Sequence, residues 1–206
     1  MTGNRLIPLV TLVVVALACS SPPAPEESLE DRAPVASDEQ LERVRAVAGT
    51  LGQQLAEHLF SELESSGPIA AIEVCSRVAQ ETAASLSRND LSVRRVSLEV
   101  RNPADEPDAW ERGKLVELAR LAADNELPDE LFSIEVAESG HELRYLKPIV
   151  IAPPCLTCHG DVATMDPELA QRLRDLYPQD RAVGYSLGDL RGAVSVRLSL
   201  AGGGDV

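Results

Sequence analysis

The stretch Cys155-Leu156-Thr157-Cys158-His159-Gly160 is the part of the sequence around which the rest of the fold can be placed. Two thiols separated by two residues and followed by a histidine form the attachment motif of c-type haem. One short turn lets each thiol reach a vinyl group of the porphyrin, and the histidine then binds iron through a neutral imidazole nitrogen. The motif therefore predicts haem c, covalently attached through Cys155 and Cys158, with His159 as an axial ligand of the iron.

Three other uses of the thiol pair are open alternatives. A thioredoxin-like redox pair opens a helix after a strand in a βαβ unit, and no such pattern surrounds residues 155–158. A structural zinc site needs four ligands, and the chain has no second ligand pair at finger or ribbon spacing. A plain disulfide between Cys155 and Cys158 leaves the adjacent His159 without a role. Haem attachment is the interpretation that uses all three side chains.

Residues 1–18 are typical of an export signal, because Arg5 is their only charge and an apolar run from Leu9 to Ala18 follows it. That run is too short for a permanent membrane span. Cleavage before Cys19 would leave a thiol that resembles the lipidated first residue of a bacterial lipoprotein, although Ala16 stands where such signals usually carry Leu. We expect a periplasmic protein anchored to a membrane through Cys19, with ordinary cleavage and release as the alternative.

The sequence after the signal divides into a tether, a domain and a tail. Residues 19–36 are rich in Pro, Glu and Ser and predict a disordered tether, and the three glycines that begin residues 202–206 predict a loose tail. Residues 37–201 are long enough for one domain with its own core. The formal charge of −14 argues against nucleic acid and anionic lipid headgroups as partners, and it is compatible with a basic redox partner.

The pattern of apolar residues predicts helices and strands that alternate along the domain. Helices are expected over residues 38–64, 68–87, from 108 to just before Pro128, and from 166 onward. The first begins with a capping box, Ser37 to Gln40, and the last with Asp166 as cap before Pro167.

Alternating apolar residues predict a strand over residues 91–101, a hairpin over residues 132–151 and a final strand over residues 194–200. The alternation slips at Arg94-Arg95, which suggests a bulge or a late start of the first strand. The order of elements predicts an α+β domain, an antiparallel sheet with helices on one face and with two helices at its N-terminal end.

A haem held by His159 has a second axial position, for which the sequence offers Cys75, His58, His141 and Met165. Cys75 is the odd thiol of an exported chain once Cys19 and the attachment pair are accounted for. It lies on the apolar stripe of the second helix, so a small buried side chain is the simpler interpretation. Ligation by Cys75, simple burial and an open sixth position all remain possible from the residues alone.

Several stretches outside the attachment motif resemble one known family. They are Val74–Ser76, Val100–Pro103, Pro107–Glu111, Arg144–Ile149, and Gly184–Tyr185 with Gly188–Val196. The chain resembles a family of single-haem c-type domains with a PAS-like core and no assigned function, which occur alone or as extracytoplasmic sensor modules. The resemblance implies a PAS-like fold and His/Cys ligation, with Cys75 in the place of the cysteine.

Cations in the same stretches are candidate partners of the haem propionates, namely Arg101, Lys147 and Arg191. A thiolate ligand would favour ferric iron and a low reduction potential. We therefore expect a redox or gas sensor, or a low-potential electron carrier, which is not an enzyme and which acts on a redox partner or a separate signalling protein. The alternatives are a haem peroxidase-like enzyme and a thiol–disulfide oxidoreductase that uses Cys155 and Cys158.

Overall fold

The computed structural model describes residues 34–138 and 140–200. The expected export signal over residues 1–18, the lipidated Cys19, the tether up to residue 33 and the tail of residues 202–206 lie outside this part of the chain. Among the helices that are described, none combines the length and the apolar character needed to cross a membrane.

The domain is built on a four-stranded antiparallel sheet with strand order β1-β4-β3-β2. The strands are β1 (Leu91–Val96), β2 (Leu131–Ala137), β3 (Gly140–Val150) and β4 (Leu190–Leu200). The predicted hairpin is confirmed as β2 and β3, and the final strand β4 lies between β3 and β1. The predicted α+β fold with an antiparallel sheet is therefore confirmed.

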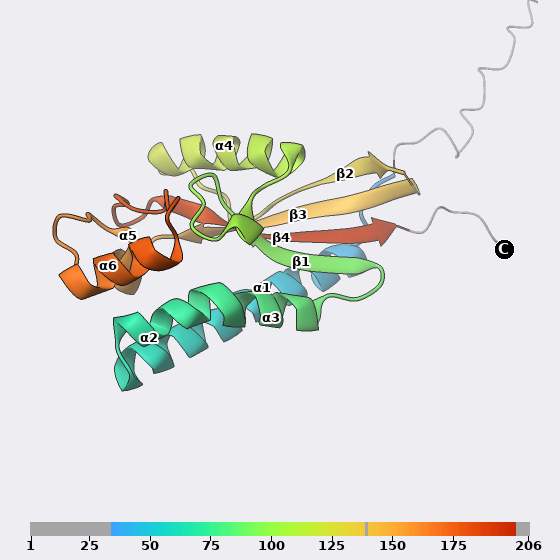
Figure 1. Cartoon of the computed structure of the whole chain (residues 1–206). Helices are drawn as coiled ribbons and strands as arrows, with labels where there is room; N and C mark the ends of the chain where they lie inside the picture. The colour runs from blue at the N-terminus through green and yellow to red at the C-terminus, as the bar shows by residue number, and fades with distance from the viewer. Residues whose placement is uncertain (1–33, 139, 201–206) are drawn as a thin grey trace, which may run out of the picture. The chain divides into compact units, whose positions relative to one another are not determined.

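Helices cover both faces of the sheet, so the expectation that they lie on one face was wrong (Figure 1). On one face lie α1 (Asp38–Ser65), α2 (Pro68–Glu73) and α3 (Ala79–Leu86), with a π-helical turn, η2 (Val74–Val78), between the last two. On the other face lies α4 (Ala109–Ala123). The reason is visible in the final strand, where successive residues are buried against opposite layers rather than alternating between core and solvent.

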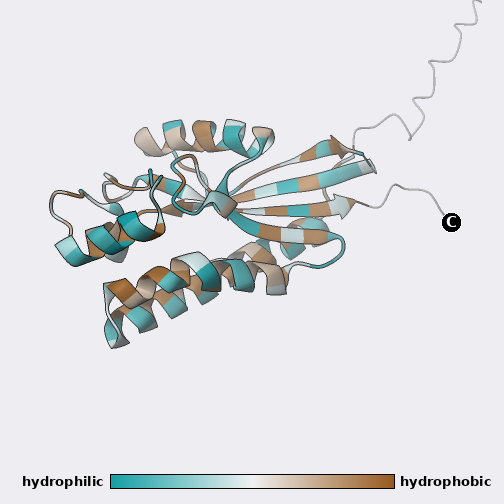
Figure 2. Ribbon diagram, in the orientation of Figure 1, coloured by the Kyte–Doolittle hydropathy of each residue, from teal (hydrophilic) through white to brown (hydrophobic). Residues whose placement is uncertain are grey.

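The two helical layers pack on opposite faces of the same strands. Val194, Val196 and Leu198 pack in the core cluster with α1 and α3, whereas Ala193 packs with Leu115 and Leu118 of α4. Figure 2 shows hydrophobic and hydrophilic segments alternating along α1 and along the strands, as expected for elements with one buried side.

Side-chain hydrogen bonds cap the N-termini of three helices. Ser37 and Gln40 form the expected capping box of α1, and Asp108 and Glu111 form a second one at α4. Asp166 caps α6 (Pro167–Leu176), as its sequence predicts. These caps satisfy backbone N–H groups that the helices themselves cannot pair.

Strand β1 is shorter than predicted and contains no bulge. Its pairing with β4 is continuous from Leu91 to Val96, after which the Ser97 N–H bonds the Asp105 carbonyl and the chain leaves the sheet. Regular alternation places Arg94 on the α4 face, where it bonds Glu111, and Arg95 on the opposite face. The break in the apolar alternation is therefore explained by two adjacent arginines, whose side chains bond residues on opposite faces of the sheet.

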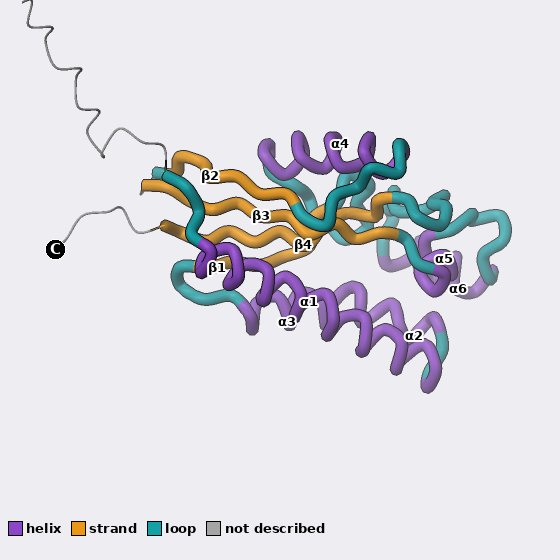
Figure 3. Tube along the Cα trace, turned by 180° about the vertical axis from the view of Figure 1, so that it is seen from behind, coloured by secondary structure: helices purple, strands orange, loops and turns teal. Residues whose placement is uncertain are grey.

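The remaining elements gather at one end of the sheet, beside α2 (Figure 3). They are η4 (Pro153–Cys155), α5 (Leu156–His159) and α6. Leu169 and Leu173 of α6 pack on Ile72 of α2. This packing brings the attachment motif next to the first helical layer, although more than seventy residues separate them in the sequence.

Candidate functional site

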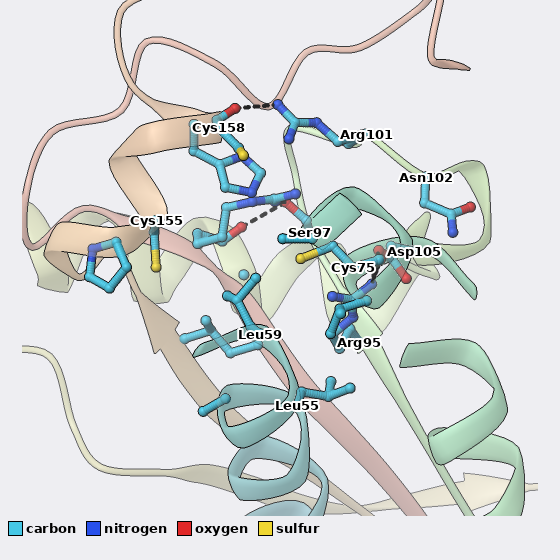
Figure 4. A pocket seen from close by; sticks show the side chains of 18 of the residues that line it. Leu55, Leu59, Cys75, Arg95, Ser97, Arg101, Asn102, Asp105, Cys155 and Cys158 are labelled. Carbon is cyan, nitrogen blue, oxygen red and sulfur yellow. Dashed lines mark hydrogen bonds and ion pairs between the residues drawn. The ribbon is translucent and has the colours of Figure 1, made fainter. Parts of the chain in front are cut away.

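A cavity of about 300 Å³ lies at this end of the sheet. It is bounded by α1, by α2 and η2, by the ends of β1 and β4, and by the loop that carries the attachment motif. Four of the predicted site residues line it together: Cys75, Cys155, Cys158 and His159. Figure 4 shows Cys155 and Cys158 on the consecutive segments η4 and α5, Cys75 on a different helical segment, and Leu55 and Leu59 of α1 below them.

The three cysteines of the cavity are free thiols. Burial, with a smaller contribution from the nearby Cys75 and Cys155, raises the pKa of the Cys158 thiol to about 11, although Arg101 acts in the opposite direction. A raised pKa is the reverse of what a nucleophilic redox cysteine needs. All strand pairs of the described sheet are antiparallel, so no βαβ unit supports the thioredoxin-like alternative either.

The ring of His159 is oriented by a single strong hydrogen bond. Its Nδ1 lies 2.6 Å from the carbonyl oxygen of Ala182, so Nδ1 carries the proton and donates it. Burial, together with the cations Arg191 and Arg101, lowers the pKa of His159 to about 3. The neutral imidazole therefore keeps the lone pair of Nε2, which is the donor atom that a metal ion requires.

A strap formed by residues 180–185 holds the attachment motif from outside. The N–H groups of Gly184 and Tyr185 donate to the carbonyls of Gly160 and His159, at 2.9 and 3.0 Å. The ring of Tyr185 also stands edge-on to the ring of His159. These contacts fix the backbone and the side chain of the histidine at the same time.

Arg101 ties this strap to the motif from inside the protein. Its guanidinium donates to the carbonyls of Cys158 and Ala182 and pairs with the carboxylate of Asp180 at 2.9 Å. Both side chains of this ion pair are buried. The expected propionate partner Arg101 is thus engaged with the protein, in a position that stabilises the loop of residues 155–160.

Gly160 closes the motif because no larger residue fits there. A Cβ at this position would lie 2.6 Å from the carbonyl oxygen of Leu156, within the last turn of α5. Gly192 meets a similar restriction in β4, where a Cβ would clash with the carbonyl oxygen of Val96. Gly192 lines the cavity, so the close approach of β1 and β4 shapes this part of its wall.

On the opposite side, Cys75 is presented by the π-helical turn η2. π-Helical turns within α-helices are rare and frequently occur at functional sites. The Cys75 carbonyl accepts a hydrogen bond of 2.7 Å from Arg95, whose guanidinium also bonds Asp105 at 3.1 Å. The predicted continuous helix over residues 68–87 is therefore present but is interrupted at the cysteine.

The remaining lining divides into an apolar part and a cationic part. The apolar part comes mainly from one side of α1 and from the start of α2: Leu55, Leu59, Phe60, Leu63 and Ile72. The cationic part comprises Arg95, Arg101 and Arg191. An apolar macrocycle with two carboxylate substituents matches this division, and three thiols with one neutral imidazole match its covalent and axial bonds. The residues of the cavity therefore fit haem c.

The other candidates for the second axial position do not line this cavity. His58 is exposed on α1, and His141 lies near the β2–β3 turn, opposite Leu200 of β4. Met165 packs beside Ile72 and Leu169 and borders a second, smaller cavity. Cys75 is the one candidate of the four that the fold brings to the attachment motif.

The expected propionate partners also differ in position. Arg191 lines the cavity, and its guanidinium donates to Ser97 and to the carbonyl of Glu99. Lys147 is exposed and lies outside the cavity lining, so its position does not support the role expected for it. Among the described residues no cluster of three or more His, Cys, Asp or Glu side chains has the arrangement of a metal site, which leaves the zinc alternative without support.

Sequence reasoning missed the supporting residues of the site. Arg95 carries one signal in the sequence, a charged residue beside a second arginine within an apolar strand, but this signal suggests a bulge or a late strand start and not a contact with Cys75. Asp180 and the Ala182 carbonyl carried none, because their roles arise from contacts with Arg101 and His159, which are distant in the sequence. Leu55 and Leu59 lie at helical spacing in the predicted first helix, a pattern that cannot distinguish a core position from a cavity wall.

Comparison with known proteins gives two matches. The family model described as Tll0287-like matches residues 25–199. A solved structure, the crystal structure of the cyanobacterial heme-protein Tll0287, is 27% identical and superposes with a TM-score of 0.57. That match covers 80% of this chain and 97% of the other. Comparison with curated proteins gives no match.

Proposed function

This chain belongs to the Tll0287-like family of haem-binding domains, and from that premise we propose that it is an exported c-type haem protein with His/Cys ligation. In this proposal Cys155 and Cys158 carry the haem, and His159 and Cys75 occupy its two axial positions. The supporting observation is the convergence of these four side chains on one cavity, from two segments far apart in the sequence.

Each of the four residues has a defined task. Cys155 and Cys158 form thioethers from one helical turn, and the Ala182 carbonyl keeps the Nε2 of His159 unprotonated. Cys75 supplies an anionic sulfur from η2. When bound, the iron porphyrin supplies a one-electron redox couple and an axial position that small ligands can occupy.

We propose a redox or gas sensor, or a low-potential electron carrier, as the role of the protein. A thiolate from Cys75 lowers the positive charge at ferric iron and so favours the oxidised state. With haem bound, a reduced iron would attract this anionic sulfur less, so Cys75 would be the side chain able to move away. The ferrous protein should therefore bind carbon monoxide readily, whereas the ferric protein should resist added ligands; equal behaviour of both states would contradict the switch.

The arrangement favours a binding protein over a peroxidase-like enzyme. A peroxidase needs acid–base groups around an open axial position. Among the described residues that line the cavity, His159 is the only histidine, and Arg95 and Arg101 are bound to carboxylates. Steady turnover of hydrogen peroxide by the purified haem protein would overturn this part of the proposal.

The proposed location and partners rest on the expected export signal and on the net charge of the chain. Attachment of haem c outside the cytoplasm, the expected export signal and Cys19 together favour a periplasmic protein held by a lipid anchor. The acidic chain favours a basic redox partner or a separate signalling protein.

The central experiment is expression of the full chain in a bacterium that matures c-type haem. The wild type should show a pyridine haemochrome spectrum of haem c, and its intact mass should include the haem. The double variant Cys155→Ser/Cys158→Ser should lose covalent haem. The matched variant Cys75→Ser should keep covalent haem but change the ferric spectrum. Colourless protein whose Cys155 and Cys158 both react with alkylating reagents would refute the proposal.

A further inference from the structure

We propose that Arg95 is the positioning residue for Cys75: it holds the π-helical turn η2 in the conformation that presents the sulfur to the cavity. This inference rests on the proposed function and adds a residue that the attachment motif does not contain. Arg95 lies in β1, twenty residues from the cysteine, and its role depends on the packing of η2 over the end of that strand.

The first part of the argument is the geometry of η2. A π-helical turn contains an extra residue per turn, so its carbonyl groups leave the hydrogen-bond register of an α-helix. Here the Ala79 N–H bonds the Val74 carbonyl rather than the carbonyl of Cys75. The Cys75 carbonyl accepts instead from the guanidinium of Arg95 at 2.7 Å. The side chain of Arg95 thus binds the very residue that carries the sulfur.

The second part is the anchoring of Arg95. Its backbone pairs with Val194 inside the sheet, and its guanidinium lies 3.1 Å from the carboxylate of Asp105. Asp105 is only 5% exposed and accepts a further bond of 3.0 Å from Gln80, which lies in α3 just beyond η2. The cluster Arg95–Asp105–Gln80 therefore binds the helix both within the turn and after it, from a rigid strand.

The third part is charge. Arg95 also lines the cavity that Cys75 faces, and most of its side chain is buried. Hydrogen bonds that involve a charged group are stronger than neutral ones and stay strong where water is excluded. The charged hydrogen bond from Arg95 can thus fix the position of the Cys75 backbone.

The other two arginines of the cavity serve different segments. Arg101 binds the haem-attachment loop and the strap on the His159 side. Arg191 binds Ser97 and the Glu99 carbonyl and has no hydrogen bond to the helix of Cys75. Arg191 is therefore the matched control, because it is a cavity cation of the same type without the contact to η2.

The test compares Arg95→Met, Arg95→Lys and Arg191→Met with the wild type, all as covalently loaded haem proteins. The first readout is the electron paramagnetic resonance signal of thiolate-ligated ferric haem. The second is the affinity of the ferric protein for added imidazole, which competes with Cys75. Covalent attachment keeps the haem in place, so both readouts follow the ligand and not the haem content.

In Arg95→Met we expect loss of most of the thiolate signal and about a tenfold or greater gain in imidazole affinity, a factor that corresponds to about 1.4 kcal/mol. Arg95→Lys keeps the charge and a donor and should give an intermediate gain. Arg191→Met should keep the thiolate signal, and its imidazole affinity should change much less than that of Arg95→Met, because Arg191 lines the cavity without bonding η2. If Arg95→Met does not fold, the comparison of Arg95→Lys with Arg191→Met decides.

Each other outcome overturns the inference in a defined way. An unchanged thiolate signal in Arg95→Met shows that Cys75 needs no such support. Equal changes in Arg95→Met and Arg191→Met show that only the general charge of the cavity matters. A wild-type protein that lacks the thiolate signal shows instead that the proposed His/Cys ligation is wrong. The failure of the ligand set and the failure of the Arg95 role are thereby distinguished.

Discussion

His159 and Arg101 donate hydrogen bonds to the same acceptor, the carbonyl oxygen of Ala182. The Nδ1 of His159 lies 2.6 Å from this oxygen, and the guanidinium of Arg101 lies 3.2 Å from it. The proximal imidazole is thus oriented by a backbone group that a buried arginine holds in place. Such outer contacts of a ligating histidine fix its tautomer and its ring orientation.

Loss of Arg101 should be strongly destabilising. Arg101→Met leaves the buried carboxylate of Asp180 without its partner, and removal of one member of a buried pair costs about 3–5 kcal/mol. Urea unfolding should show this loss, whereas Arg120→Met, in an exposed pair with Asp124, should change the free energy of unfolding by less than about 0.5 kcal/mol. Similar values for the two variants would contradict the role given to Arg101.

Two glycine substitutions should have opposite effects. Gly160→Ala places a Cβ 2.6 Å from the Leu156 carbonyl, so the last turn of α5 must shift, and both stability and the yield of covalent haem should fall. Gly113→Ala in α4 meets no atom within 4 Å and should raise stability by about 0.5–1 kcal/mol, because glycine is unfavourable inside a helix. Thermal unfolding measures the stability of the two variants, and haem staining measures the yield of covalent haem. Normal haem loading of Gly160→Ala would be evidence against the close contact with the Leu156 carbonyl.

The second axial ligand should be identified by a small set of variants. Cys75→Ser should lower the stability of the ferric ligand set and raise the midpoint potential, because it removes the anionic donor. His58→Gln, His141→Gln and Met165→Leu should leave the ferric spectrum unchanged, since none of these side chains lines the cavity. Spectroelectrochemistry gives both the ferric spectrum and the midpoint potential. A changed ferric spectrum in any of the last three variants would identify that residue, and not Cys75, as the candidate ligand.

Stability should decline in acid through Asp108. Burial raises the pKa of this carboxyl, but the Glu111 N–H, Arg144 and Arg197 outweigh it, so the net pKa in the folded protein is lowered. A lowered folded-state pKa means that the stabilisation is present above the unfolded-state value and is lost as pH falls through the folded value.

The variant Asp108→Asn isolates this contribution, because Asn keeps the helix cap while losing the charge. We expect it to be about 1–2 kcal/mol less stable than the wild type at pH 7, as for the loss of charged hydrogen bonds. This difference should shrink as the pH is lowered. Urea titrations at several pH values measure it, and a difference that grows in acid would exclude this role.

The sequence predicted the parts of this fold that depend on local patterns. The capping box at Ser37, the helix that starts near Asp108, the hairpin and the final strand follow from neighbouring residues, and all are present. The second covered face of the sheet was not predicted. Its strand residues are partly polar, such as Ser195 bonded to Glu111 and Arg144 bonded to Asp108, so the pattern suggested solvent where α4 lies.

The candidate site could be predicted only where the chemistry itself dictates spacing. The two thiols and the histidine of residues 155–159 must be adjacent, so they form a readable motif. Cys75 was found by accounting for thiols and by resemblance. Arg95 and Asp180 act through contacts that exist only after the chain has folded, and no spacing rule contains them.

The adjacent residues Arg94 and Arg95 give β1 an additional property. One guanidinium reaches the buried Glu111 beneath α4, and the other reaches the turn that carries Cys75. A single peptide unit therefore links α4 on one side of the sheet to η2 on the other. A rotation of this strand end that withdrew one guanidinium from its partner would also displace the other guanidinium. A displacement of Cys75 would then reach α4, none of whose residues lines the cavity.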